Sequence, residues 1–175
     1  MMKIRIKFRK YGTMKFIGHL DVMRYFQKAI RRSEVNIRYS EGFSPHQIMS
    51  FAAPLGVGIT SKGEYVDIEV LDTENSKKMI DRLNAVMSEG FEILEYKLLP
   101  DDAANAMSIV AAADYSLVFR PGYEPEKESP EEWFEKLVRF FDADHVMIMK
   151  KTKKGEREMD LKPFVYELNV RKNGE

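Results

Sequence analysis

The chain has 175 residues and a mass of 20.4 kDa, long enough to bury a hydrophobic core as one domain or two small ones. Hydrophobic residues make up 44% and charged residues 32%, a composition that excludes a disordered chain. The absence of cysteine excludes disulfides and any zinc or iron–sulfur site held by thiolates of this chain. We therefore expect a globular, cytoplasmic protein without a cofactor of its own.

The first ten residues alternate between apolar side chains at Ile4, Ile6 and Phe8 and basic side chains at Arg5 and Lys7. This period of two predicts a strand, and it leaves no continuous apolar run for a signal peptide or a membrane span. Residues 1–50 hold 11 Lys and Arg against 3 Asp and Glu, although the whole chain holds 28 of each. The asymmetry indicates either a polyanion-binding surface or a basic segment that packs against the acidic remainder of its own fold.

A helix is predicted from His19, because apolar residues then recur at spacings of three and four. Gly18 stands at the N-cap position, and Asp21 can interact with the positive end of the helix. The inward face is predicted to comprise Leu20, Met23, Phe26 and Ile30. The opposite, polar stripe comprises Asp21, Arg24, Lys28 and Arg31.

The rest of the first hundred residues continues this alternation of elements. Strands are predicted over residues 36–40, 47–53, 64–70 and 91–96, with a Gly/Pro turn at 41–46 and a helix over 75–88. The order β-α-β-β-α-β predicts an α+β fold in which residues 1–100 form a ferredoxin-like domain. In that arrangement both helices cover one face of an antiparallel sheet, and the other face is left free.

Residues 100–105 are predicted to form a linker, after which a second α+β half occupies residues 106–175. Ser129-Pro-Glu-Glu132 is a strong helix start, with a capping serine and proline at the first helical position. Strands are predicted over 115–119, 145–149 and 164–170, with a basic hairpin tip between the last two. This pattern is a ferredoxin-like unit that is either incomplete or divergent. The basic residues of the predicted tip are Lys150, Lys151, Lys153, Lys154 and Arg157.

The basic stripe of the first helix suits a phosphate backbone, and exposed aromatics beside it suit unstacked bases of single-stranded RNA. We expect Phe16 and Phe51 to lie in the core instead. The alternative is that the stripe is a solvated helix face and that Arg5 and Lys7 pair with Asp67 and Glu69 on a neighbouring strand. The candidate binding residues are Arg24, Lys28, Arg31, Tyr39, Phe43, Asp21 and Asp67.

Two histidines in the same region, His19 and His46, are the candidates for acid–base chemistry because histidine titrates near neutral pH. Histidines at a helix start or after a turn proline are more often hydrogen-bonded structural residues. Glu64, Asp67 and Glu69 alternate along a predicted strand, the pattern of a solvated strand face, so no metal site is predicted. The sequence thus favours a protein that is not an enzyme.

Six short motifs of the first seventy residues resemble the radical SAM-linked proteins, a bacterial family of uncharacterised function. They are Arg5-Ile-Lys-Phe, Phe16-Ile-Gly-His-Leu-Asp, Tyr39-Ser, Gly42-Phe with Pro45-His, Pro54-Leu-Gly and Gly63-Glu-Tyr-Val-Asp67. The sequence departs from the family pattern at three places. Gly18 stands where the family has serine, and Ser44 where it has asparagine. Gln47-Ile48 stands where the family has proline followed by a basic residue. Because this cation is missing, the resemblance gives less reason to expect phosphate binding at that turn.

The resemblance implies a partner, a radical SAM enzyme encoded nearby or fused in relatives, whose cluster lies outside this cysteine-free chain. We expect an accessory or substrate-binding protein for that enzyme, with RNA as the substrate. One alternative is a metal-independent endoribonuclease of duplicated ferredoxin-like type that uses His19 or His46. Another is a protein–protein interaction module whose basic third binds an acidic surface.

Overall fold

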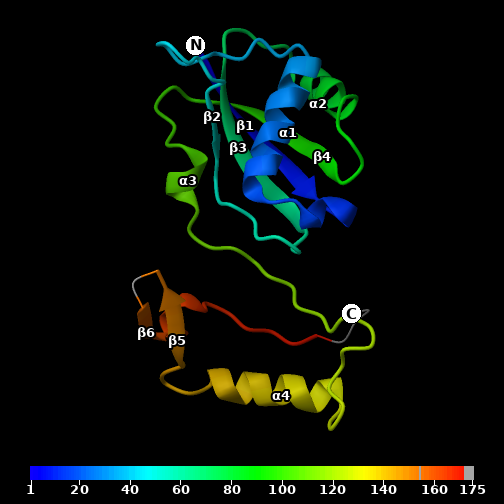
Figure 1. Cartoon of the computed structure of the whole chain (residues 1–175), viewed down its shortest axis with the longest axis vertical. Helices are drawn as coiled ribbons and strands as arrows, with labels where there is room; N and C mark the ends of the chain where they lie inside the picture. The colour runs from blue at the N-terminus through cyan, green and yellow to red at the C-terminus, as the bar shows by residue number, and fades with distance from the viewer. Residues whose placement is uncertain (154, 172–175) are drawn as a thin grey trace. The chain divides into compact units, whose positions relative to one another are not determined.

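The computed structural model describes residues 1–153 and 155–171 (Figure 1). The chain divides into two compact units, one of residues 1–114 and one that begins at Tyr115. The fold is mixed α+β, with a four-stranded antiparallel sheet in the first unit and a two-stranded sheet in the second. Within the described residues, no helix is long and apolar enough to cross a membrane.

The first unit is built on a sheet with the strand order β2-β3-β1-β4. Its strands are β1 (Met2–Lys10), β2 (Met49–Phe51), β3 (Ser61–Val70) and β4 (Phe91–Leu99). Ile4 pairs with Ile68 and Ile6 with Val66, so the alternating apolar residues of neighbouring strands reach the same face. These four side chains are at most 1% exposed, which confirms the strand predictions made from alternation.

Two helices, α1 (His19–Arg32) and α2 (Ser76–Asn84), follow the predicted positions. Gly18 is the N-cap of α1 as predicted, and the Asn75 side chain caps α2 by accepting from the Lys78 N–H. The buried face of α1 consists of Val22, Phe26, Ala29 and Ile30. The prediction that Leu20 faces inward was wrong, because its side chain is 62% exposed.

Residues 100–105, predicted as a linker, are held by side chains of the sheet face opposite the helices. Lys3 Nζ donates to the carbonyls of Asp101 and Ala103, and Arg5 donates to the carbonyl of Ala104. The short helix α3 (Ala106–Ile109) follows, and the Ala106 side chain is 2% exposed. This segment is therefore anchored to a face that was expected to be free.

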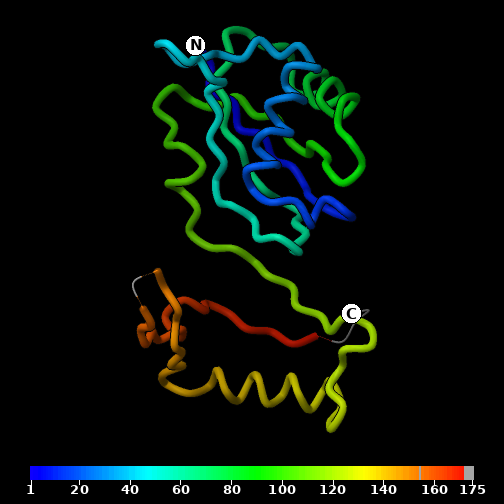
Figure 2. The backbone as a smooth tube through the Cα atoms, in the orientation of Figure 1, coloured from blue at the N-terminus to red at the C-terminus, as the bar shows by residue number. Residues whose placement is uncertain are grey.

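The second unit contains α4 (Pro130–Phe141), β5 (Met147–Thr152) and β6 (Gly155–Asp160), which form one helix and one hairpin (Figure 1). Ser129 and Glu132 complete the predicted capping box of α4. The predictions of strands at 115–119 and 164–170 were wrong: both run as chain without strand pairing, apart from the 3-10 turn Lys162–Phe164 (Figure 2). β6 begins inside the predicted basic tip, of which Lys154 lies outside the described residues.

Candidate nucleic-acid interface

The solvent-facing side of α1 carries the predicted cationic stripe. Arg24, Lys28 and Arg31 are all exposed, and they lie along one side of the helix because they are spaced three and four residues apart. Arg24 contacts Asp21 at 3.5 Å, with both side chains more than 60% exposed. In the described part of the chain, no ion pair engages Lys28 or Arg31. Their charges are available to an external anion.

Tyr39 lies beside this stripe. Gln47 Nε2 is 3.4 Å from the Tyr39 hydroxyl and 3.3 Å from the carbonyl of Gln27, whose neighbours on the helix surface are Arg24 and Arg31. Gln47 is 6% exposed, and its Oε1 has no hydrogen-bond partner among the described residues. The buried amide thus fixes a 44% exposed tyrosine next to exposed cations of α1.

The turn at 40–46 extends beyond the bridge between Tyr39 and Gln47. Its ends are tied by Ser40 and His46: Ser40 N donates to the His46 carbonyl at 2.8 Å, and Ser40 Oγ lies 2.8 Å from His46 Nδ1. Gly42 has a φ of +107°, a conformation that glycine adopts without strain. Phe43 follows with its ring fully exposed, as a surface aromatic and not as core.

The two candidate histidines belong to different surroundings. His19 begins α1 and packs edge-on against the Phe51 ring at 5.3 Å, whereas His46 is exposed in the turn with Ser40. Between them, Gln47 to Phe51 spans about 13 Å as extended chain, and α1 rises about 12 Å from His19 to Gln27. The structure therefore does not bring His19 and His46 together as an acid–base pair.

Asp67 lies on the opposite side of the sheet from α1. Both of its carboxylate oxygens accept from Arg5, at 2.8 and 2.9 Å, and it also accepts from the Ala106 N–H at 2.7 Å. This hydrogen-bonded pair raises the pKa of Arg5 further above its usual value. The predicted Arg5–Asp67 pair is confirmed, while Lys7 pairs with Glu95 and Glu69 with Arg38. Asp67 is thus separated from the cationic stripe.

Three large apolar side chains at or near the start of α1 are exposed, and the sequence pattern did not identify them. Phe16, Leu20 and Val57 are 65%, 62% and 63% exposed. The prediction that Phe16 lies in the core was wrong, whereas Phe51 is 7% exposed as expected. Helical spacing could not predict the exposure of Leu20, because this residue fits the apolar period. Only the tertiary contacts of α1 place its side chain on the outside.

Lys10 was also not identified from the sequence as a residue of the core. It continues the series Ile4, Ile6 and Phe8 on the core face and is 1% exposed. Its Nζ donates to the Ile17 carbonyl at 3.0 Å, just before the start of α1. Burial lowers the pKa of the Lys10 ammonium, and nearby Glu64 partly offsets this effect. Alternation along β1 was the signal that placed Lys10 inward.

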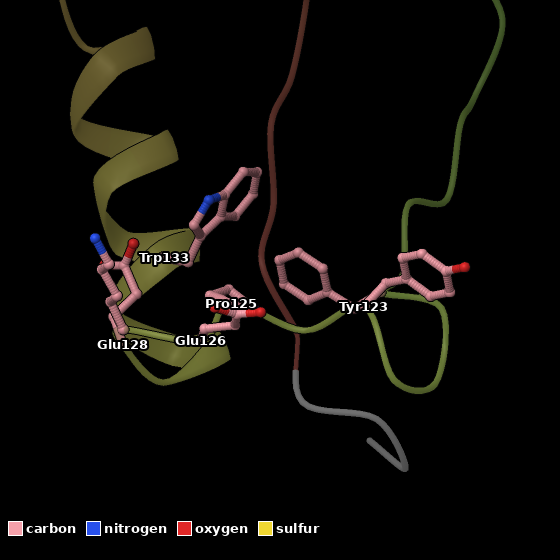
Figure 3. Close-up of a pocket in the computed structure, with 7 residues that line it drawn as sticks. Tyr123, Pro125, Glu126, Glu128 and Trp133 are labelled. Atoms are coloured by element: carbon pink, nitrogen blue, oxygen red, sulfur yellow. The ribbon is translucent and has the colours of Figure 1, made fainter.

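An open hollow of about 440 Å³ occurs in the second unit (Figure 3). Trp133 and Phe119 line it together with Tyr123 and residues 125–128. Glu128 there is paired with Lys136, and none of the candidate binding or catalytic residues belongs to it. Across the described residues, no group of His, Asp or Glu side chains could hold a metal ion.

The arrangement around α1 can bind an anionic, partly planar ligand through charge and aromatic surface. A family model described as "Uncharacterized protein conserved in bacteria (DUF2344)" matches residues 3–175 of the chain. No curated protein matches the chain.

Proposed function

The chain belongs to DUF2344, a family of uncharacterised proteins conserved in bacteria, and we propose that it is a non-catalytic accessory protein that binds RNA for a radical SAM enzyme. The observation that carries RNA binding is the position of Tyr39 beside Arg24, Lys28 and Arg31 on α1. Phosphates contact the cations, and unstacked bases contact the aromatic faces.

The exposed charges of Lys28 and Arg31 support this assignment over a purely solvated helix face. Among the described residues no ion pair engages either side chain, so both can release counterions on binding a phosphate backbone, which favours association. Phe43 extends the aromatic surface at the tip of the adjacent turn. Bound single-stranded RNA would then pass along α1 and across the turn at 40–46.

The partner and the setting belong to the same proposal. The resemblance of the first seventy residues to radical SAM-linked proteins is the reason for proposing this enzyme as the partner. The iron–sulfur cluster would be bound by the enzyme, because this chain has no cysteine. A cytoplasmic location would give access to both RNA and enzyme. We also propose a ferredoxin-like arrangement for the first unit, supported by its antiparallel strand order β2-β3-β1-β4.

RNA binding is tested with a fluorescein-labelled single-stranded RNA of mixed sequence, by anisotropy at a series of salt concentrations. We expect Lys28→Ala/Arg31→Ala to weaken binding and to lower the slope of log affinity against log salt by about 1.4, since about 0.7 is expected for each lost phosphate contact. The matched control Lys77→Ala/Lys97→Ala removes two exposed cations from α2 and β4. Equal losses in both double variants would contradict a specific site on α1.

The endoribonuclease hypothesis remains a prediction that the separate surroundings of His19 and His46 do not favour. The same labelled RNA, analysed on a denaturing gel after incubation, tests it directly. We expect intact RNA with the wild-type chain. Cleavage that is lost in His19→Ala or His46→Ala would replace the accessory role with catalysis.

A further inference from the structure

The exposed apolar residues Phe16, Leu20 and Val57, here called the α1-start patch, lie next to the N-terminal end of the cationic stripe of α1. Phe16 ends the 3-10 turn η1 (Gly12–Phe16), and Leu20 belongs to the first turn of α1. Gly18 lies between Phe16 and Leu20 in the sequence, and Val57 Cγ2 is 4.0 Å from the position that a Cβ on Gly18 would take. The Val57 side chain is therefore close to the backbone that joins the other two residues. Three large apolar side chains more than 60% exposed at one place indicate an interaction surface.

The backbone beneath the α1-start patch is held by contacts of its own. The buried Lys10 ammonium donates to the Ile17 carbonyl at 3.0 Å, and Gly58 N donates to the Lys15 carbonyl at 2.7 Å. Burying an ammonium group is costly, yet here it fixes the turn between Phe16 and Leu20. A surface fixed before binding loses less conformational entropy when a partner docks.

The charges next to the α1-start patch are mainly positive. Lys15 Nζ lies 5.1 Å from the centre of the Phe16 ring, and Arg24 follows Leu20 by one helical turn. Lys28 continues the same direction without an ion pair among the described residues. Asp21 is the acidic side chain in this part of α1, and it already contacts Arg24. The neighbourhood therefore favours a negatively charged partner.

We propose that the α1-start patch docks an acidic amphipathic helix of a partner protein. The apolar side of that helix would cover Phe16, Leu20 and Val57, and its carboxylates would meet Lys15 and Arg24. Two aliphatic side chains offer no stacking surface for bases, which favours protein over RNA at this patch. A two-fold contact between copies of this chain would place the same cations against each other.

A helix suits this surface better than an added strand. Phe16 and Leu20 project from helical backbone whose hydrogen-bonding groups are turned along the helix axis, so these two segments offer no strand edge for β-addition. The inference goes beyond RNA binding, because its apolar contacts use side chains that the RNA proposal does not, and it survives if RNA does not bind. Arg24 is the residue that both proposals share. It names the surface through which an accessory protein could hold its enzyme.

The test uses a fluorescein-labelled designed 18-residue peptide with leucines at helical spacing and glutamates on both flanks. Its counterpart with lysine at every glutamate position is the charge control. With the full chain, we expect anisotropy to report a dissociation constant on the order of 10 µM for the acidic peptide and much weaker binding of the basic one. Phe16→Ser/Leu20→Ser should weaken acidic-peptide binding by about tenfold or more, equivalent to about 1.4 kcal/mol.

Two further variants separate the patch from general effects. Val57→Ser tests the same surface from another segment, and Leu71→Ser/Leu98→Ser removes two leucines that are 56% and 55% exposed elsewhere in the first unit. We expect the former to weaken peptide binding and the latter to leave it unchanged. Equal binding of the acidic and basic peptides, or no response to Phe16→Ser/Leu20→Ser, would overturn the proposal.

The same variants distinguish the other occupants. Loss of RNA binding with unchanged peptide binding in Phe16→Ser/Leu20→Ser would assign the patch to RNA, and a dimer in sedimentation that this variant abolishes would assign it to a second copy. Either outcome overturns the acidic-helix proposal. If wild type binds the acidic peptide as expected but no RNA, the RNA function fails and the docking surface stands.

Discussion

The two units differ in how completely their elements bury one another. In the first unit, Ile4, Ile6, Val66 and Val70 are fully buried between the sheet and two helices. In the described part of the second unit, Val146 is the buried apolar residue, at 1% exposure, while α4 buries none of its side chains. Both units contain helices that begin at the predicted N-cap and antiparallel strand pairs. Correct local patterns therefore yield a core only when enough neighbouring elements close over the apolar face.

The largest expected effect on stability comes from removing a large buried ring from the core of the first unit, and a matched change in the second unit tests the contrast. Phe26 is 1% exposed and contacts the rings of Phe8, Phe51 and Phe91. Phe26→Ala should lower the free energy of unfolding of the first unit by about 3–5 kcal/mol, because a large buried ring leaves a cavity. The measurement is a urea titration followed by far-ultraviolet circular dichroism.

The matched change in the second unit is Phe140→Ala, whose ring is 55% exposed. It should cost less than about 1 kcal/mol, since little apolar surface returns to water. Trp133 is the single tryptophan of the chain, so its fluorescence reports the second unit separately. A Trp133 transition that moves with Phe26→Ala would show that the two units unfold together and would break the contrast.

A smaller effect is expected where the sheet anchors residues 101–106. Arg5→Ala leaves Asp67, which is 13% exposed, without its bidentate partner, and it removes the donor to the Ala104 carbonyl. We expect a loss of about 2 kcal/mol in the first unit and faster hydrogen exchange of the Ala106 amide. Arg9→Ala is the control, because its pair with Glu92 is 45% and 39% exposed and should contribute less than about 1 kcal/mol.

The first unit was the more predictable region because its signals are local and repeated. Alternation along β1 and β3 identifies the core face, and the helical period identifies α1. The prediction for Leu20 was wrong because α1 is positioned so that Val22 and Ala29 share the inner face with Phe26 and Ile30. The spacing of apolar residues gives several overlapping faces, and the contacts with the sheet decide among them.

The predicted strands of the second unit show the limit of β-propensity. Residues 115–119 and 164–170 are rich in aromatic and β-branched side chains, yet neither pairs with another strand. β-propensity measures how well side chains fit a sheet, and a strand needs a partner that the sequence pattern does not specify. By contrast, the α4 start was predictable because its capping box is local.

For the candidate site, sequence patterns located α1 and its cations. The alternation of Asp67 with Val66 and Ile68 also shows that Asp67 faces away from α1 once β3 forms, so this pattern separates Asp67 from the other candidate binding residues. The surroundings of His46 depend on the turn at 40–46, whose bend at Gly42 sets positions that spacing cannot predict. Tertiary contacts alone place Tyr39 beside the stripe.

The buried ammonium of the first unit gives a pH test. Burial lowers the pKa of Lys10 from its usual 10.5, so between the folded value and 10.5 the unfolded chain holds more protons. The stability of the first unit therefore gains a contribution as pH rises through that interval. Lys10→Met removes this titration, and we expect the difference in unfolding free energy between the Lys10→Met variant and the wild-type chain to change with pH. A constant difference would contradict the burial effect.

The smallest expected effect concerns the second unit, where Asp160 closes the β5–β6 hairpin region. Its pKa is lowered from 3.8 to about 2, first by the hydrogen bond with His145 and then by the N–H groups of Val146 and Lys162. Because the folded value is depressed, the stabilisation is present above 3.8 and is lost as pH falls toward about 2. Asp160→Asn should flatten this acid dependence of the Trp133 fluorescence transition. His145→Ala should keep part of it, since the two backbone donors remain, and an unchanged acid profile in Asp160→Asn would show that this carboxylate does not hold the second unit together.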